Sequence, residues 1–277
     1  MITVDLHSHS TMSDGVLTPE DVARRAHANG VRLWALTDHD ILDGVPAARA
    51  QARALGMGFV AGVEISVTWS GHTVHIVGLN VDDGHAGLNE GLRAVRSGRT
   101  ERAREIGRRL DAMGVNNSYE GALVYVSNPA LISRTHFARY LVDQGYCKNV
   151  QAVFSRYLGE NSPAYVPMQW SSLAQAVGWI HEAGGRAVIA HPGRYDYTPL
   201  QFDALFEQFR DLGGEGIEVI TGSHTPDQYR QYADVARRYG FLASCGSDFH
   251  SPKEARLDLG RLPSLPDDLT PIWHDWQ

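Results

Sequence analysis

The sequence has little cysteine and no long hydrophobic segment. Only two of its 277 residues, Cys147 and Cys245, are cysteines. That is too few for a disulfide framework and favours a reducing compartment. No uninterrupted apolar run approaches about 18 residues, so no membrane-spanning helix is expected. The first residues lack the basic and apolar regions of a secretory signal. We therefore expect a cytoplasmic chain without membrane association.

Positive charge is also scarce. Lys and Arg number 25 against 32 Asp and Glu, and the formal net charge of −7 argues against a protein that coats nucleic acid by charge alone. Hydrophobic residues make up 43% and charged residues 21%, which permits a sizeable core and excludes general disorder. The length allows one large domain, or one domain that carries an insertion.

Short apolar segments recur along the chain and predict seven strands. Most are rich in Val, Ile or Leu without strict alternation, as expected for strands buried on both faces. They are Ile2–Leu6, Leu33–Thr37, Gly58–Val67, Thr73–Leu79, Ala187–Ala190, Gly216–Ile220 and Leu242–Ser244.

Helix signals lie between several of these strands. Thr18 precedes a proline and two acids, and Asn29-Gly30 ends the helical pattern that follows. Ser171 or Ser172 can cap a second helix, and Pro226–Tyr239 reads as a third. Strands alternating with helices predict a largely parallel α/β fold, and seven such units favour a distorted (β/α)7 TIM-like barrel.

One segment interrupts the alternation. From about Arg96 to Tyr165 the pattern is helical, and residues 96–160 contain ten basic and six acidic side chains. We interpret residues 96–165 as a helical cap subdomain inserted into a barrel made of residues 1–95 and 166–277. The alternative for Arg99–Arg109 is an ordinary solvated helix face.

Potential metal ligands gather where the predicted strands end. The chain has 13 histidines, and imidazole is the commonest metal ligand in proteins. In a parallel barrel the carboxyl ends of the strands open onto one face, so residues distant in sequence meet there. The candidates are His7, His9, Asp14, His39, Glu64, His75, His191, Asp248 and His250.

The types of ligand limit the choice of metal. No cysteine lies in the cluster, which disfavours a structural thiolate site. Imidazole mixed with carboxylate suits Mn²⁺, Fe²⁺ or Zn²⁺, and nine ligands are too many for one ion. The sequence therefore predicts two or three divalent ions, with Glu64 as a bridging carboxylate. Such ions can generate hydroxide near neutral pH and hold a phosphoryl group.

The motifs Asp5-Leu-His-Ser-His, Thr37-Asp-His-Asp, Gly62-Val-Glu, Ala190-His-Pro and Gly246-Ser-Asp-Phe-His resemble those of the polymerase-and-histidinol-phosphatase (PHP) family of metal-dependent phosphoesterases. The family belongs to the wider amidohydrolase-like group, and the resemblance covers nearly the whole chain. It implies a barrel with a trinuclear site, usually of manganese, with iron or zinc as alternatives. It places His7, His9, Glu64 and Asp248 on one ion, Glu64, His75 and His191 on a second, and Asp14, His39 and His250 on a third. Many members have histidine where this chain has Asp14, so occupancy of the third position is left open.

Two further elements, Ser133-Arg-Thr-His-Phe-Ala-Arg139 and His191-Pro-Gly-Arg194, resemble the TrpH-like subgroup. That subgroup includes phosphatases of nucleoside 3′,5′-bisphosphates and enzymes that trim short oligoribonucleotides from the 5′ end. Ser133 can cap a helix whose free N–H groups favour an anion. Arg134 and Arg194 are suited to bind phosphate bidentately. We also include His136 among the candidate substrate-binding residues.

The resulting hypothesis is hydrolysis of the 3′-phosphate of a nucleoside 3′,5′-bisphosphate, such as adenosine 3′,5′-bisphosphate, to give AMP. Hydroxide bridging two ions, oriented by Glu64 and Asp248, attacks phosphorus, and His191 or water protonates the leaving oxygen. Arg134 holds the second phosphate. The same site could trim short RNA or DNA oligonucleotides, and no obligate protein partner is evident. The alternatives are a histidinol phosphate phosphatase and a non-catalytic PHP domain that serves in binding or regulation.

Overall fold

The computed structural model describes residues 3–276, and seven strands there form one nearly closed barrel. Neighbouring strands pair in chain order, and β1 returns to β7 through the bond from Leu6 N to Cys245 O and that from Asp248 N to His7 O. The strands are β1 (Val4–Asp5), β2 (Leu33–Leu36), β3 (Gly58–Trp69), β4 (His72–Leu79), β5 (Arg186–Ile189), β6 (Gly216–Thr221) and β7 (Leu242–Gly246). The predicted α/β barrel is confirmed, and Ile2 of the first predicted strand lies outside the described residues.

Strand β4 departs from the parallel arrangement that the sequence predicted. It pairs antiparallel with both β3 and β5. The cause is the two-residue turn Ser70-Gly71, in which both residues have positive φ (48° and 82°). Such a turn joins two antiparallel strands as a tight hairpin, whereas parallel neighbours need a longer crossover. Because β4 runs in the opposite direction, its N-terminal half, which contains His75, lies at the barrel mouth.

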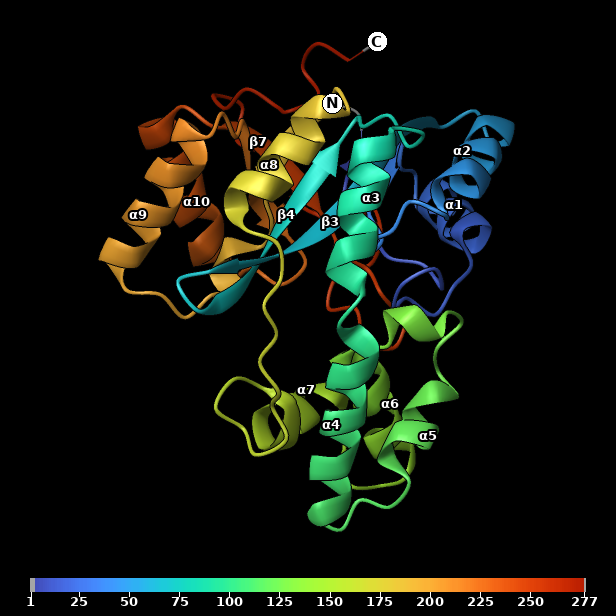
Figure 1. The fold of residues 1–277 in the computed structure, drawn as a ribbon. Coiled ribbons are helices and arrows are strands. Elements are labelled where there is room, and N and C mark those ends of the chain that lie inside the picture. Colours follow the sequence, from blue (N-terminus) through green and yellow to red (C-terminus); the bar gives the residue numbers. More distant parts are fainter. Residues whose placement is uncertain (1–2, 277) are drawn as a thin grey trace.

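Six helices cover the outside of the barrel (Figure 1). Three of them, α8, α9 and α10, begin with a capping box in which a Ser or Thr hydroxyl and a Gln side chain bond each other's backbone N–H groups. The predicted helix over Pro226–Tyr239 is confirmed. The helices are α1 (Pro19–Ala28), α2 (Val45–Ala54), α3 (Ala86–Arg96), α8 (Leu173–Glu182), α9 (Pro199–Asp211) and α10 (Pro226–Tyr239).

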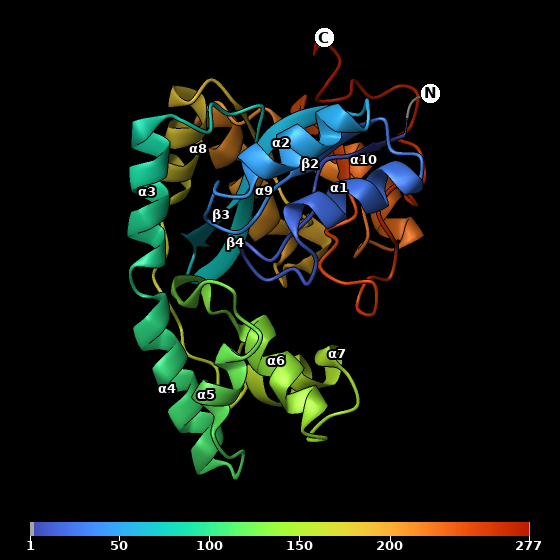
Figure 2. The same ribbon diagram turned by 90° about the vertical axis from the view of Figure 1, so that its right-hand side faces the viewer.

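The chain between Arg99 and Leu158 forms a separate group of helices. Its elements are α4 (Arg99–Ala112), α5 (Ser118–Leu123), η1 (Pro129–Leu131), α6 (Arg134–Asp143), α7 (Val150–Val153) and a π-helical turn η2 (Phe154–Leu158). They enclose their own hydrophobic cluster, centred on Phe137, Leu141 and Leu158, whereas the barrel has two clusters of its own. Figures 1 and 2 show these helices at one end of the barrel, opposite both termini, with α4 continuing from α3. We keep the division at residues 96 and 165 as our interpretation and call this unit the cap.

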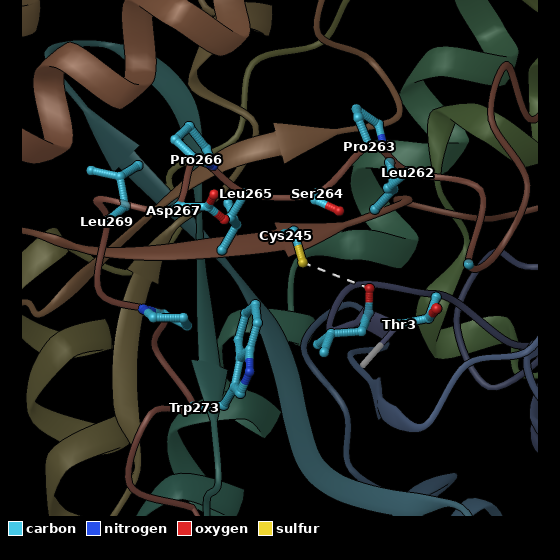
Figure 3. Close-up of a pocket in the computed structure, with 13 residues that line it drawn as sticks. Thr3, Cys245, Leu262, Pro263, Ser264, Leu265, Pro266, Asp267, Leu269 and Trp273 are labelled. Carbon is cyan, nitrogen blue, oxygen red and sulfur yellow. Dashed lines mark hydrogen bonds between the residues drawn. The ribbon is translucent and has the colours of Figure 1, made fainter. Parts of the chain in front are cut away.

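A cavity of about 310 Å³ lies beside the start of β1, beneath the C-terminal segment (Figure 3). Thr3, Cys245 and Trp273 are among its lining residues, and the Cys245 thiol donates to the carbonyl of Val4 there. None of the nine candidate ligands lines this cavity. No helix in residues 3–276 is long and apolar enough to cross a membrane.

Candidate metal centre

The barrel mouth brings all nine candidate ligands together. His7, His9 and Asp14 follow β1, and His39 follows β2. Glu64 lies within β3 and His75 within β4, because the β3–β4 hairpin extends these two strands past the ends of their neighbours. The loop after β5 supplies His191, and that after β7 supplies Asp248 and His250. His191 and Asp248 have φ of 28° and 54°, a strained backbone of the kind that concentrates at functional sites.

One group has the geometry of a four-ligand site. One donor atom from each of His7, His9, Glu64 and Asp248 lies within 4.8 Å of all the others. His9 Nε2 is 3.3 Å from Glu64 Oε2 and 3.2 Å from Asp248 Oδ1. His7 Nε2 is 3.3 Å from Glu64 Oε2. These are the residues expected around the first ion.

Two further groups share members with the first. Glu64 Oε1 lies 2.8 Å from both His75 Nδ1 and His191 Nε2, which are the expected partners around the second ion. Asp14 Oδ1 lies 3.2 Å from His250 Nε2 and 3.8 Å from His39 Nε2, which are its expected partners around the third ion.

The third group is more connected than the sequence suggested. His9 joins Asp14, His39 and His250 within the same 4.8 Å limit. His39 also approaches Glu64, with 2.9 Å between its Nδ1 and Oε2. Glu64 therefore stands at the centre of the whole arrangement, as a bridging ligand should.

The donor atoms are suited to metal rather than to hydrogen bonding. Within residues 3–276, Glu64 Oε2, Asp14 Oδ1 and Asp248 Oδ1 are buried and have no hydrogen-bond partner. Buried oxygens without partners are costly, and a cation would satisfy them. Burial raises the pKa of Glu64, but His75, His39 and His7 outweigh it and hold that pKa well below its usual range. The cluster can therefore hold metal with its carboxylates ionised.

The environment of His191 favours metal binding over proton donation. Burial, with help from Arg194, lowers the pKa of its imidazole to about 3. A neutral imidazole is the form that binds metal, but it has no acidic proton to give at neutral pH. The sequence named His191 as one candidate acid, and this environment favours the other candidate, water.

Glu218 is a functional residue that the sequence analysis missed. It projects from β6, and its Oε1 lies 2.7 Å from His7 Nδ1 while its Oε2 accepts a 2.6 Å bond from the N–H of His191. Because His7 Nδ1 must carry the proton in this pair, Nε2 is left free to bind metal. In the sequence, Glu218 could have been recognised as the one carboxylate within the apolar segment Gly216–Ile220.

Two adjoining cavities open beside the cluster. The larger, of about 290 Å³, is lined by His75, His191, Tyr195 and Tyr197 among others. The smaller, of about 110 Å³, is lined by Asp14, His39, Asp248, His250 and residues of the cap. Arg134 and Arg194 line both cavities. The structure therefore places both predicted phosphate-binding arginines next to the ligand cluster.

Cap arginines give the smaller cavity excess positive charge. Arg99 is paired with Asp40, and its guanidinium carbon lies 4.7 Å from the centre of the Trp170 ring. Arg134 and Arg102 instead bond the backbone carbonyls of Leu158 and Val166, and neither forms an ion pair within residues 3–276. Burial, with Arg134 and Arg99 nearby, lowers the pKa of Arg102 to about 9. Two guanidiniums thus lack a counter-anion, which a phosphate could supply.

The other two predicted substrate residues have structural roles in the cap. His136 is 1% exposed, and its Nδ1 accepts the N–H of Ser133 as part of the capping box of α6. It lines neither cavity, and burial lowers its pKa to about 4. We therefore assign His136 to capping in place of the suggested substrate contact. Ser133 lines the smaller cavity, and its hydroxyl donates to Asp14 Oδ2 at 3.3 Å.

The PHP domain family matches residues 5–239 of the chain. The chain belongs to the PHP domain family. Two curated relatives match this PHP protein over nearly its whole length. The 3′,5′-nucleoside bisphosphate phosphatase of Chromobacterium violaceum is 50% identical over 275 residues, covering 99% of this chain and 96% of the relative. The 5′-3′ exoribonuclease Rnm of Salmonella typhimurium is 40% identical over 278 residues, covering 100% and 94%.

A solved structure agrees with the fold of this PHP chain. An amidohydrolase from Chromobacterium violaceum, determined with bound sulfate and no metal, has a TM-score of 0.95 at 50% identity. The match covers 98% of this chain and 94% of the other. The barrel and cap described above therefore have a counterpart in a solved structure.

Proposed function

We propose that this PHP protein removes the 3′-phosphate from nucleoside 3′,5′-bisphosphates. The observation that carries the proposal is the smaller cavity, whose lining includes five of the candidate ligands together with Arg102 and Arg134, neither of which forms an ion pair within residues 3–276. A substrate with two phosphates satisfies both, because one phosphate can meet the metal centre while the other neutralises Arg102 and Arg134. Binding energy from the remote phosphate can then lower the barrier at the reacting one. The 50% identical relative is named as a 3′,5′-nucleoside bisphosphate phosphatase, which supports this substrate class.

Different residues have different roles in the proposed reaction. Bound ions, which we propose to be Mn²⁺ with Fe²⁺ or Zn²⁺ as alternatives, supply hydroxide and Lewis-acid stabilisation. Glu64 and Asp248 orient the nucleophile. Arg194, whose Nη1 donates to Asp248 Oδ2 at 2.8 Å and whose side chain is half exposed, is placed to bind the reacting phosphate. His191 holds metal, and water provides the proton for the leaving oxygen.

Phosphate release from four substrates tests the proposal. Adenosine 3′,5′-bisphosphate, 3′-AMP, 5′-AMP and histidinol phosphate are compared at equal concentration with added Mn²⁺. We expect strong preference for the bisphosphate and 5′-AMP as the nucleotide product. Preference for histidinol phosphate would leave the metal centre standing and overturn the substrate assignment, because that substrate has no second phosphate for Arg102 and Arg134.

A second candidate activity is trimming of short RNA from its 5′ end. The 40% identical relative named as a 5′-3′ exoribonuclease favours it, and the chemistry at phosphorus is the same. A 5′-phosphorylated oligoribonucleotide should release 5′-mononucleotides one at a time, which denaturing gel electrophoresis would resolve. Random internal cleavage would contradict anchoring by a terminal phosphate.

A further inference from the structure

Helix α6 of the cap makes two hydrogen bonds to Asp14. The hydroxyl of Ser133, just before the helix, donates to Asp14 Oδ2 at 3.3 Å. Six residues further along, Arg139 Nη1 donates to the backbone carbonyl of Asp14 at 2.6 Å. The cap therefore contacts both the side chain and the backbone of one candidate ligand.

Arg139 also reaches a second barrel loop. Its Nε and Nη2 each lie 2.8 Å from the carboxylate of Glu254, four residues after His250. Arg139 is 7% exposed, whereas Glu254 is exposed, so this bidentate pair is buried on the side of the arginine. Arg139 thus joins the loop that carries Asp14 to the loop that carries His250.

The barrel holds the Asp14 loop on both sides of Asp14. After it, the N–H groups of Gly15 and Val16 donate to the carbonyls of Ser10 and His250, each at 2.9 Å. Asp38 accepts bonds from Ser10 N at 2.7 Å, Ser10 Oγ at 2.6 Å and Ser13 Oγ at 2.6 Å. Among residues 3–276, the hydrogen bonds to the side chain and carbonyl of Asp14 come from Ser133 and Arg139. Asp14 Oδ1 is left without a partner, 3.2 Å from His250 Nε2.

We infer that Ser133 and Arg139 are positioning residues for the third ligand group, so that the docked cap sets the affinity of that group for its ion. Ser133 occupies Oδ2 and leaves Oδ1 directed at His250 and His39. Arg139 fixes the backbone from which the carboxylate projects. Both bonds come from one helix, and a helix is a rigid carrier for them. The inference rests on the proposed metal centre but not on the proposed substrate.

Counting ions tests this inference without measuring activity. Protein stripped of metal is equilibrated with a series of free Mn²⁺ concentrations, and bound manganese per chain is measured by elemental mass spectrometry. We compare the wild type with Arg139→Ala, Ser133→Ala and Glu254→Gln. The matched control is Arg186→Ala, because Arg186 makes a similar bidentate pair with Asp275 of the C-terminal segment and lies opposite Leu79, at the end of the strands away from the barrel mouth.

We expect Arg139→Ala to weaken only the most weakly bound ion, by about 10–100-fold as for other residues that orient ligands. Ser133→Ala should weaken the same ion by less, and Arg186→Ala should match the wild type. Arg139→Lys should restore part of the loss. An unchanged titration for both Arg139→Ala and Ser133→Ala would overturn the inference. So would equal weakening of all ions. If Arg139→Ala does not fold, judged by circular dichroism, Ser133→Ala and Glu254→Gln decide the matter.

Discussion

The barrel and the cap contribute opposite kinds of chemistry to one site. The barrel supplies imidazoles and carboxylates from neighbouring strands and from the loops that follow them, and these groups gather because the strands are already side by side. The cap supplies guanidiniums from α4 and α6 and places them against the same cavity. The comparison teaches that the barrel supplies the candidate metal ligands, whereas the cap contributes most of the guanidiniums that line the smaller cavity, to which we assign the selection of phosphate.

The largest effect should come from the centre of the barrel's cluster. Glu64→Gln removes a charge that faces imidazoles on several sides, and we expect activity to fall by about a thousandfold or more, since the ions supply several kcal/mol. Removing metal with a chelator should cause a similar loss, and Mn²⁺ should reverse it in the wild type alone. Phosphate release measures both. A Glu64→Gln protein that keeps full metal content and activity would refute the bridging role.

Removing one cap guanidinium should lower the activity on the bisphosphate much more than the activity on the monophosphate. Arg134→Ala should reduce kcat/KM for adenosine 3′,5′-bisphosphate by about a hundredfold, because a charge-assisted contact contributes about 1.5–3 kcal/mol. The loss for 3′-AMP, which has no second phosphate, should be several-fold at most. Arg156→Ala, an exposed arginine of the same cap, is the control. Equal losses on both substrates would show that Arg134 does not select the second phosphate.

The barrel's supporting carboxylate should have an intermediate effect on both substrates alike. Glu218→Gln keeps the shape of the side chain but weakens its hold on His7 and on the backbone of His191, so we expect about a 10–100-fold loss of metal affinity. Titration with Mn²⁺ measures it. Glu207→Gln, an exposed carboxylate on α9, should change nothing at the site. If Glu218→Gln lowered activity on the bisphosphate alone, Glu218 would act on the second phosphate, which we assign to the cap, and not through the metal ligands.

The smallest effect concerns the pH dependence of stability. Burial lowers the pKa of His136 from 6.5 to about 4, so folding favours the neutral ring. The unfolded chain therefore binds more protons between these values, and stability falls as pH drops from 6.5 towards 4. For His136 alone the loss between pH 6.5 and pH 5 is about 2 kcal/mol.

His136→Gln should remove this contribution and keep the cap. Glutamine already occupies the equivalent position in the capping boxes of α8, α9 and α10, so it can replace His136 in that of α6. Urea unfolding at pH 7 and pH 5 should show a smaller difference in the variant. Activity on the bisphosphate should remain. If activity collapses while the fold survives, His136 does contact substrate after all.

The barrel side of the site was predictable because its signals are local. His7 and His9 stand two residues apart at a strand end, and such a pair is visible without any structure. The turn residues Ser70-Gly71 are also a local signal in the sequence, and the hairpin that they form makes β4 antiparallel to its neighbours. Glu218 was harder to find, since one acid in a buried strand gains meaning only when His7 lies opposite it.

The cap was less predictable because its contacts cross long distances in sequence. Nothing near Arg139 indicates that it pairs with Glu254 or bonds the carbonyl of Asp14. Likewise Arg102 carries no motif, and its lack of a counter-anion is a property of the folded cap. His136 lies between two candidate residues, and that place suggested a substrate contact; in the structure its Nδ1 accepts the N–H of Ser133 in the capping box of α6, and the substrate contact stays a prediction.

The position of the cap within the chain also bears on folding. Strands β4 and β5 pair with Leu79 opposite Arg186, although about a hundred residues separate them, and closing so long a loop costs entropy. The two ends of the cap lie side by side, since Arg102 Nε bonds Val166 O at 2.8 Å and Arg109 Nη1 bonds Tyr165 O at 2.5 Å. A cap that folds first on its own hydrophobic cluster therefore shortens the effective loop to about forty residues. A folded cap thus lowers the entropy cost of pairing β4 with β5, because fewer flexible residues then join the two strands.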